Sequence, residues 1–428
     1  MSFISLINKY AKTEQAKSIA IYTFSNFFNK GVSFLLLFYF THALLESDFG
    51  LLSLFSNSIL LLMPFVSMGI LQSVNTDYFK MEKAPFKDFF TTTLIMPIVV
   101  TLLIVITAFF LRHQLHSRYS FPNIFIVLIP VITFFNFLNE HLINMVRNNN
   151  EPIKYLIINV GRLMAEIALA VFFISALQYG WLGRVMGILI SYFVVAVYAF
   201  IYFKQQGFLF GKLRKKVVID ELIYSVPIII MQMSIFAMNS SSGYYIEYFT
   251  HSYSTVGIYS VAATFASIII VLCGALLQYV YPKIYSLLSE NEINYPSIKK
   301  HFLFYAGAML GGTLLVIIFT PLAYAVVLKP SYHEGLSYYY FICLGYFFWT
   351  ITYFFYSFML YYKLKRKILL ISLISIVVSV LCNYFFIKHW GSYGAALAIF
   401  TGYLSILIIT LLFVKREIVA ILHTQPVE

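Results

Sequence analysis

The same motif at the start of a predicted helix occurs twice in the sequence. It reads YGWLGRVMGILISYF at residues 179–193 and WGSYGAALAIFTGYL at residues 390–404. Each copy reads aromatic residue, glycine, two residues, glycine, three residues, a small residue, isoleucine and then tyrosine. Gly183 matches Gly394 and Tyr192 matches Tyr403, both at an offset of 211 in a chain of 428 residues. A motif that recurs at half the chain length predicts an internal duplication.

The composition predicts that both halves are embedded in a membrane. The chain is 61% hydrophobic and only 11% charged, whereas soluble domains carry roughly 25% charged residues. Stretches such as VVTLLIVITAFFL at 99–111 and ILLISLISIVVSVL at 368–381 lie within long, nearly uncharged segments. Because about 20 apolar residues cross a bilayer, we expect an all-α integral membrane protein with twelve transmembrane helices.

The repeat predicts how these helices are organised. Six spans in each half return the chain to the same side, so the two halves are a parallel pseudo-two-fold repeat with a central cavity between two six-helix lobes. A weaker match links FTHALLESDFGLLSLF, from Phe40, to FTHSYSTVGIYSVA, from Phe249. We expect an N-terminal lobe at 1–203, a basic cytoplasmic linker at 204–221 and a C-terminal lobe at 222–428.

Charge sets the expected orientation. With the N-terminus inside, 22 of the 29 lysines and arginines fall in the inside segments, so both termini are expected in the cytoplasm. The positive charge then faces anionic lipid, and nucleic acid is not an expected partner.

The first 18 residues do not resemble a cleavable signal peptide, so the first span is expected to act as its own anchor. The three cysteines are expected to pack as small apolar residues.

Polar residues form stripes within several predicted spans. A polar side chain is costly in lipid, so such stripes mark packing seams or water-filled cavities. The stripes on the first, fourth, fifth and seventh spans favour a hydrated cleft between the lobes. The predicted cavity residues are Asn26, Asn29, Lys30, Ser33, Asn136, Arg162, Gln232 and Asn239.

The charged members of these stripes have two readings each. Lys30 either meets an anionic substrate or pairs with Glu140 or Glu166. Arg162 and Glu166 are four residues apart, so they can neutralise one another. Glu140, His141 and Glu166 are candidates for coupling to a proton or sodium gradient, although a structural polar seam explains Glu140 and His141 equally well.

Enzyme signatures are missing from the sequence. There is no glycine-rich phosphate loop, no pair of acids in a hydrophilic loop, and no His/Cys cluster with metal-ligand spacing. We therefore expect a protein that is not an enzyme and that has no catalytic residues, metal or cofactor.

Several motifs resemble the bacterial polysaccharide transporters, the Wzx-type lipid-linked oligosaccharide flippases of the multidrug/oligosaccharidyl-lipid/polysaccharide exporter superfamily. The resemblance lies in Asn29–Gly31 of the first span, in the turn from Leu45 to Gly50, and in YGWLGRVMG, VGIYSVA and GSYGAALA. One departure is that Ser242-Gly243-Tyr244 stands where the family often has an Asp-Arg-(Phe/Tyr) element, so the role of that acid–base pair is not carried over.

The resemblance implies a flippase in the bacterial inner membrane. Such a protein moves an undecaprenyl-diphosphate-linked oligosaccharide repeat unit, of O-antigen or capsule type, to the outer leaflet by alternating access. It works among membrane lipids, with a polysaccharide polymerase and a chain-length regulator as further expected partners in lipopolysaccharide biosynthesis. The alternatives are a cation-coupled drug or small-molecule antiporter of the same architecture and, less well matched, a membrane enzyme of glycan assembly.

Overall fold

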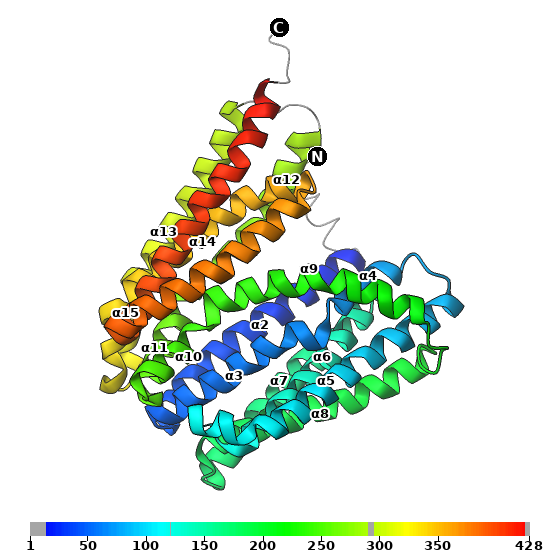
Figure 1. Ribbon diagram of the computed structural model, residues 1–428, viewed down its shortest axis with the longest axis horizontal. Coiled ribbons are helices and arrows are strands. Elements are labelled where there is room, and N and C mark those ends of the chain that lie inside the picture. Colours follow the sequence, from blue (N-terminus) through cyan, green and yellow to red (C-terminus); the bar gives the residue numbers. More distant parts are fainter. Residues whose placement is uncertain (1–13, 120, 290–294, 424–428) are drawn as a thin grey trace. The chain divides into compact units, whose positions relative to one another are not determined.

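The computed structural model describes residues 14–119, 121–289 and 295–423. All regular secondary structure within these ranges is helical, and short loops join the helices (Figure 1). The side chains of Asn26, Lys30 and Ser33 lie outside the described residues. The helices are α2 (Glu14–Ala43), α3 (Glu46–Ser67), α4 (Ile70–Asp77), α5 (Lys83–Tyr119), α6 (Asn123–Asn148), α7 (Pro152–Val171), the π-helix η1 (Phe172–Ala176), α8 (Gly180–Gln205), α9 (Lys215–Ser240), α10 (Ser242–Thr250), α11 (Tyr253–Ala266), α12 (Ile268–Ser289), α13 (Tyr295–Val327), the 3₁₀-helix η2 (Pro330–Gly335), α14 (Leu336–Tyr361) and α15 (Lys365–His423).

The lengths and apolar composition of these helices make the protein a multi-pass membrane protein. In the described part of the chain, ten helical segments are long and apolar enough to cross a bilayer. Helix α2 is not among them, since Asn26, Asn29 and Lys30 lower its hydropathy. Helix α15 counts once, although Gly391 interrupts it and divides it into an orange and a red rod in Figure 1. The number of twelve spans therefore stays a prediction.

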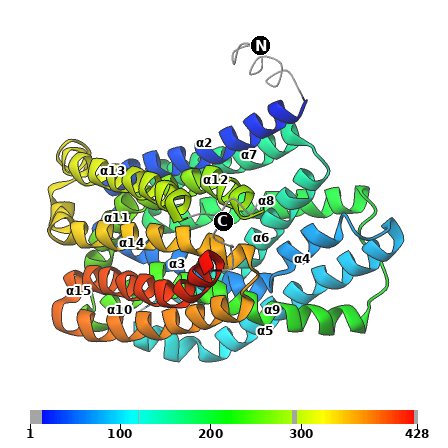
Figure 2. The same cartoon turned by 90° about the horizontal axis from the view of Figure 1, so that it is seen from above.

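The two copies of the repeated motif adopt the same local backbone. Gly180 and Gly391, which follow the aromatic residue of each copy, have φ of 54° and 53°, a region that favours glycine. One turn later, a Cβ on Gly183 would lie 3.0 Å from the backbone of η1, and a Cβ on Gly394 would lie 2.0 Å from the carbonyl oxygen of Phe386. Each copy thus reverses the chain and presses the next helix against the preceding one. The segment after Gly391 lies alongside α14, where Phe341 contacts the rings of Tyr393 and Phe400 (Figure 2). The segment before Gly391 contacts α10, where Asn383 Oδ1 accepts a hydrogen bond from the hydroxyl of Ser242 at 2.8 Å.

The chain divides into two compact units. Unit 1 holds the described residues up to Leu44 together with Phe55–Ile229, and unit 2 holds Leu45–Leu54 together with the described residues from Ile230 onward. The first turns of α3 therefore belong to unit 2. Helix α9 passes from one unit into the other two residues after Pro227.

A symmetrical glycine contact fixes the first turns of α3 within unit 2. A Cβ on Gly50 would lie 1.9 Å from the carbonyl oxygen of Tyr253, and a Cβ on Gly257 would lie 2.2 Å from that of Glu46. Three residues further along each helix, the hydroxyls of Ser53 and Ser260 form a 2.7 Å hydrogen bond. Small residues let membrane helices approach until their backbones touch. Because these four residues come from the two FTH segments matched above, the duplicated halves contact one another here through equivalent positions.

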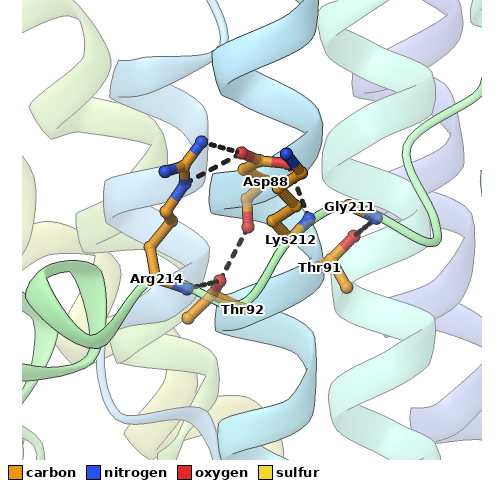
Figure 3. Close-up of polar contacts among 6 residues, drawn as sticks. All are labelled: Asp88, Thr91, Thr92, Gly211, Lys212 and Arg214. Atoms are coloured by element: carbon orange, nitrogen blue, oxygen red, sulfur yellow. Dashed lines mark hydrogen bonds and ion pairs between the residues drawn. The ribbon is translucent and has the colours of Figure 1, made fainter.

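The basic segment expected as a linker is largely packed against unit 1. Only residues 206–214 within 204–221 lie outside helices, and we call residues 208–214 the strap. The strap runs along the first turns of α5 (Figure 3). Thr91 Oγ1 donates to the carbonyl oxygen of Phe208 at 3.1 Å and accepts from the N–H of Gly211 at 2.9 Å. These bonds explain why a hydrophilic segment lies fixed on the surface of a helix.

The close contact at Gly257 predicts that a side chain added there destabilises the protein more than one added at an open glycine position. Gly257→Val should lower the free energy of unfolding by about 1 to 3 kcal/mol, since the new methyl groups have no room beside the backbone of α3. Gly307→Val is the matched control, because no atom lies within 4 Å of a Cβ built at Gly307. Thermal unfolding of the purified variants in detergent measures both effects. Equal stability of the two variants would contradict the close contact between α3 and α11.

Candidate functional site

The strongest charged feature in the membrane part of unit 1 joins α7 to α8. Arg162 and Glu166 lie one turn apart on α7, and Arg184 lies in the second turn of α8. Arg162 Nη1 is 2.5 Å from Glu166 Oε2, and Arg184 Nη2 is 2.5 Å from Glu166 Oε1. One carboxylate is therefore shared by two guanidinium groups. We call these three residues the arginine–glutamate cluster.

Close packing of α7 and α8 explains how the cluster forms. A Cβ on Gly187 would lie 2.9 Å from the carbonyl oxygen of Glu166, so only a glycine lets α8 come this near. The exposed fractions of the three side chains are 12% for Arg162, 7% for Glu166 and 19% for Arg184. Because the helices touch at this level, the charges meet away from the surface of unit 1.

Aromatic rings complete the surroundings of both arginines. The guanidinium carbon of Arg162 lies 4.4 Å from the ring centre of Tyr192, and that of Arg184 lies 4.9 Å from the ring centre of Phe40. A cation over an aromatic face is stabilised by the negative charge of that face. These rings hold the guanidinium planes but supply no anion.

The charge of the cluster is not balanced. Two guanidinium groups and one carboxylate leave a formal charge of +1, and the buried atoms Arg162 Nε and Arg184 Nη1 have no hydrogen-bond partner. Glu140, on α6, acts electrostatically on Arg162, but it is exposed and no ion pair joins the two. A buried cation with unused N–H donors is expensive in a membrane unless an anion reaches it. The cluster is therefore suited to bind an anionic group.

Glu140 and His141 are neighbours in sequence but face different surroundings. Glu140 is exposed, whereas His141 is fully buried. The imidazole stacks on Phe90, with 4.8 Å between ring centres, and on Phe137 at 5.5 Å. Neither ring nitrogen has a hydrogen-bond partner. The structure thus separates the two groups, and coupling through His141 stays a prediction.

Of the other predicted cavity residues in unit 1, the structure describes the side chains of Asn29 and Asn136. The calls on Asn26, Lys30 and Ser33 fall on side chains outside the described residues. Asn29 is half-buried, and its Oδ1 is buried without a hydrogen-bond partner. Asn136 is half-buried on α6. In the part of the chain that the structure describes, no hydrogen bond or ion pair joins Asn29 or Asn136 to the arginine–glutamate cluster.

Unit 2 has an uncharged pocket in which aromatic rings and hydroxyl groups predominate. Its volume is about 80 Å³, well below the roughly 300–1,000 Å³ of pockets that enclose a ligand. It therefore has room for one face of a ring and does not enclose a whole molecule. We call it the aromatic–hydroxyl pocket, and its lining consists of Met231, Ser234, Ile235, Met238, Trp349, Thr352, Tyr353, Tyr356, Ser372, Ser375, Tyr403 and Ile406.

One face of α14 supplies three of the four rings of this pocket, and Tyr403 of α15 supplies the fourth. Trp349 and Tyr353 lie one turn apart with ring centres at 4.3 Å, and Tyr356 stacks on Tyr353 at 5.6 Å. The hydroxyls of Ser372 and Ser375 donate to carbonyl oxygens of their own helix at 3.0 and 2.8 Å. Each such hydroxyl keeps lone pairs that can accept from a ligand O–H. Flat apolar faces beside hydroxyl acceptors suit a sugar ring.

One of the two predicted residues of α9, Asn239, contacts a lining residue of this pocket. The hydroxyl of Tyr403 donates to Asn239 Oδ1 at 2.7 Å, and Asn239 Nδ2 donates to the carbonyl oxygen of Ile235 at 3.1 Å. Gln232 is half-buried on the same helix. Asn239 therefore positions the ring of Tyr403 at the wall of the pocket.

Sequence reasoning did not single out Arg184 or the rings on α14 as site residues. Arg184 lies inside the quoted motif, but a lone arginine at the start of a helix gives no signal for a binding site. The spacing of Trp349, Tyr353 and Tyr356 places them on one helix face, and this was the available signal. It was hidden because the chain holds 34 tyrosines and 44 phenylalanines. Among the described residues, no group of three histidine, cysteine or acidic side chains is arranged to hold a metal ion.

Comparison with solved structures places the fold. A multidrug resistance MATE family transporter of the MOP superfamily, in an inward-facing conformation, aligns with a TM-score of 0.72 and 15% identity, covering 91% of this chain and 96% of that chain. The lipid II flippase MurJ, in an inward closed conformation, aligns with a TM-score of 0.69 and 12% identity, covering 94% and 90%. MATE in the straight conformation aligns with a TM-score of 0.58 and 17% identity, covering 95% and 97%. At these identities the likeness shows a shared two-lobed fold.

Comparison at the level of sequence identifies the family. No curated protein matches the chain. A model of the family described as polysaccharide biosynthesis protein matches residues 15–288, which is more than half of the chain. This match confirms the resemblance to the polysaccharide transporters. The chain therefore belongs to the polysaccharide biosynthesis protein family.

Proposed function

We propose that this protein is a flippase that moves an undecaprenyl-diphosphate-linked oligosaccharide from the inner to the outer leaflet of the bacterial inner membrane. The observation that carries the proposal is the arginine–glutamate cluster, a buried charge of +1 with two unused N–H donors in a membrane helix pair. A diphosphate is an anion that such donors bind well, since guanidinium groups match phosphate oxygens in shape and charge. The shared fold with MurJ supports transport of a lipid-linked substrate.

The aromatic–hydroxyl pocket supports a sugar as the other part of the substrate. A sugar ring has apolar C–H faces and hydroxyl edges, and Trp349, Tyr353 and the serine hydroxyls of α15 complement both. The pocket contains no charged residue, so it favours neutral rings over anionic ones. An oligosaccharide joined to a diphosphate combines the two chemistries found in the two units.

Transport in this proposal follows alternating access, with both termini in the cytoplasm and a proton or sodium gradient as the energy source. The polyprenyl tail stays in lipid while the polar head passes through the protein. A cation-coupled drug antiporter is the less supported alternative. Such a carrier needs available acids within its spans, and of the two candidates Glu166 is already shared by two arginines, which leaves Glu140 alone.

Removal of one positive charge tests the anion-binding role of the cluster. Arg184→Gln leaves Glu166 paired with Arg162 but makes the cluster neutral. We expect transport to fall roughly tenfold or more, which is the loss of one hydrogen-bonded charge contact. Arg184→Lys, which keeps the charge, is the control and should retain most activity. The measurement is accumulation of lipid-linked repeat unit in cells of a deletion strain that carry each variant, at matched protein level. Normal transport by Arg184→Gln would remove the cluster from the mechanism.

Loss of the stacking face tests the sugar-binding role of unit 2. Trp349→Leu should weaken binding of the free oligosaccharide roughly three- to tenfold, because one aromatic contact is lost. Tyr340→Leu is a matched control on the same helix, since Tyr340 is exposed and does not line the pocket. Calorimetric titration of the purified protein with oligosaccharide that lacks the lipid measures the difference. An equal effect of the two substitutions would mean that the pocket does not bind sugar.

The third test concerns Lys30, whose role in transport is predicted from the sequence alone. Lys30→Ala should abolish surface glycan at normal protein level if its ammonium group offsets the charge of the substrate. Lys30→Arg, which keeps the charge, should retain surface glycan. Immunoblotting of surface glycan together with the membrane-bound protein separates loss of transport from loss of protein. Unchanged glycan in Lys30→Ala would exclude Lys30 from the transport path.

A further inference from the structure

A second cavity lies in unit 1, where α5 and α9 begin, and the transport scheme does not use it. Its volume is about 630 Å³, which is within the roughly 300–1,000 Å³ typical of ligand pockets. Its walls come from residues 81–89, at the start of α5, and residues 210–217, which are the end of the strap and the first turn of α9. Lys87, on the first of these segments, and Lys212, on the second, both line the cavity.

The strap gives the cavity a fixed wall. Asp88 Oδ1 accepts the backbone N–H of Lys212 at 2.7 Å, and Asp88 Oδ2 accepts Arg214 Nη2 at 2.6 Å and Arg214 Nε at 2.9 Å (Figure 3). The N–H of Arg214 also donates to Thr92 Oγ1 at 3.1 Å. A Cβ on Gly211 would lie 2.5 Å from the carbonyl oxygen of Lys87, so the strap touches the backbone of α5. These contacts hold Lys212 by its backbone, and its ammonium group acts electrostatically on the Asp88 carboxylate without forming an ion pair with it.

The cavity has an excess of positive charge. Asp88 is the one acidic residue of the lining, and Arg214 neutralises it. The ammonium groups of Lys87 and Lys212 have no ion-pair partner in the described part of the chain. The segments 78–89 and 204–216 together hold eight basic and two acidic residues. An anion is therefore attracted to this mouth, and the two lysines are available to contact it.

Apolar side chains beside the lysines favour an amphiphile over a small free anion. Phe89, 4% exposed, forms the floor, and Phe210 stands at the rim with 80% of its surface exposed. Met81, also at the rim, is 37% exposed. Exposed aromatic rings beside lysines at the ends of spanning helices are typical of the level of lipid headgroups. A free phosphate ion uses the lysines but gains nothing from Phe210.

We propose that this cavity binds the phosphate headgroup of an anionic membrane phospholipid. Lys87 and Lys212 contact the phosphate, the Asp88–Arg214 clamp holds the strap in place, and Phe210 and Met81 pack against the start of the acyl chains. The lysines lie at the membrane side that carries most of the basic residues, where anionic lipid is attracted. The site is separate from the arginine–glutamate cluster, and binding there requires no transport.

The test compares lipid binding by the full-length protein, purified in detergent and stripped of lipid. Native mass spectrometry is used to titrate the protein with phosphatidylglycerol, phosphatidylcholine and inorganic phosphate in separate arms. Phosphatidylglycerol should bind more tightly than the other two. The double variant Lys87→Gln/Lys212→Gln should bind phosphatidylglycerol roughly tenfold more weakly, since each lysine contributes to attraction of an anionic lipid. Neither substitution removes a hydrogen bond of the strap, so folding is preserved.

Lys299→Gln/Lys300→Gln is the matched control, because these two exposed lysines lie in the first turns of α13 in unit 2. It should bind phosphatidylglycerol within about twofold of the unaltered protein. Hydrogen exchange of residues 81–89 and 208–214 should slow when phosphatidylglycerol is added, in the unaltered protein and in the control only. Equal losses in both double variants, or no protection of these segments, would overturn the site. Binding of inorganic phosphate as tight as that of phosphatidylglycerol would overturn the lipid assignment and make the cavity a free-anion site.

Discussion

Close approach of helix backbones is the constraint on which the described structure depends. In lipid there is no hydrophobic force between helices, so packing and polar contacts must hold them together. Gly50 and Gly257 bring α3 and α11 into backbone contact, and Gly187 does the same for α8 and α7. A side chain at any of these three positions would collide with a backbone atom. The arginine–glutamate cluster exists because the second of these contacts leaves no gap between the helices that carry its charges.

The duplicated halves share their backbone geometry but not their chemistry. Arg184, in the first copy of the motif, corresponds to Ala395 in the second, which is fully buried. The matched tyrosines also differ in their partners, since Tyr192 stacks on Arg162 and Tyr403 hydrogen-bonds to Asn239. The same helix entry therefore supports a charged site in unit 1 and an uncharged, aromatic site in unit 2. Divergence of this kind is expected where two halves of one carrier bind different parts of a substrate.

The sequence was sufficient to predict the helical membrane fold and the repeat, because hydropathy and glycine spacing are local signals. It also predicted that Arg162 and Glu166 can pair, since four residues make one helical turn. It could not show that Arg184 shares Glu166, because that contact depends on how α7 packs on α8. Likewise, the segment 204–221 looked like a linker, since its binding partners Asp88, Thr91 and Thr92 lie more than 110 residues earlier in the chain. The polar stripe that grouped His141 with Glu140 failed to separate two adjacent side chains that face different surroundings.

The distribution of charge gives a physical reason for assigning different tasks to the two units. The arginine–glutamate cluster and the cavity beside the strap are both positive, and both lie in unit 1. The aromatic–hydroxyl pocket has no charged lining and lies in unit 2. Electrostatic attraction acts over about 8 Å at physiological salt, whereas ring stacking requires contact. Under the proposed function, unit 1 therefore captures the phosphate end of the substrate from a distance. Unit 2 then discriminates among sugars only after the head group has arrived, because a neutral ring gains nothing until it touches Trp349.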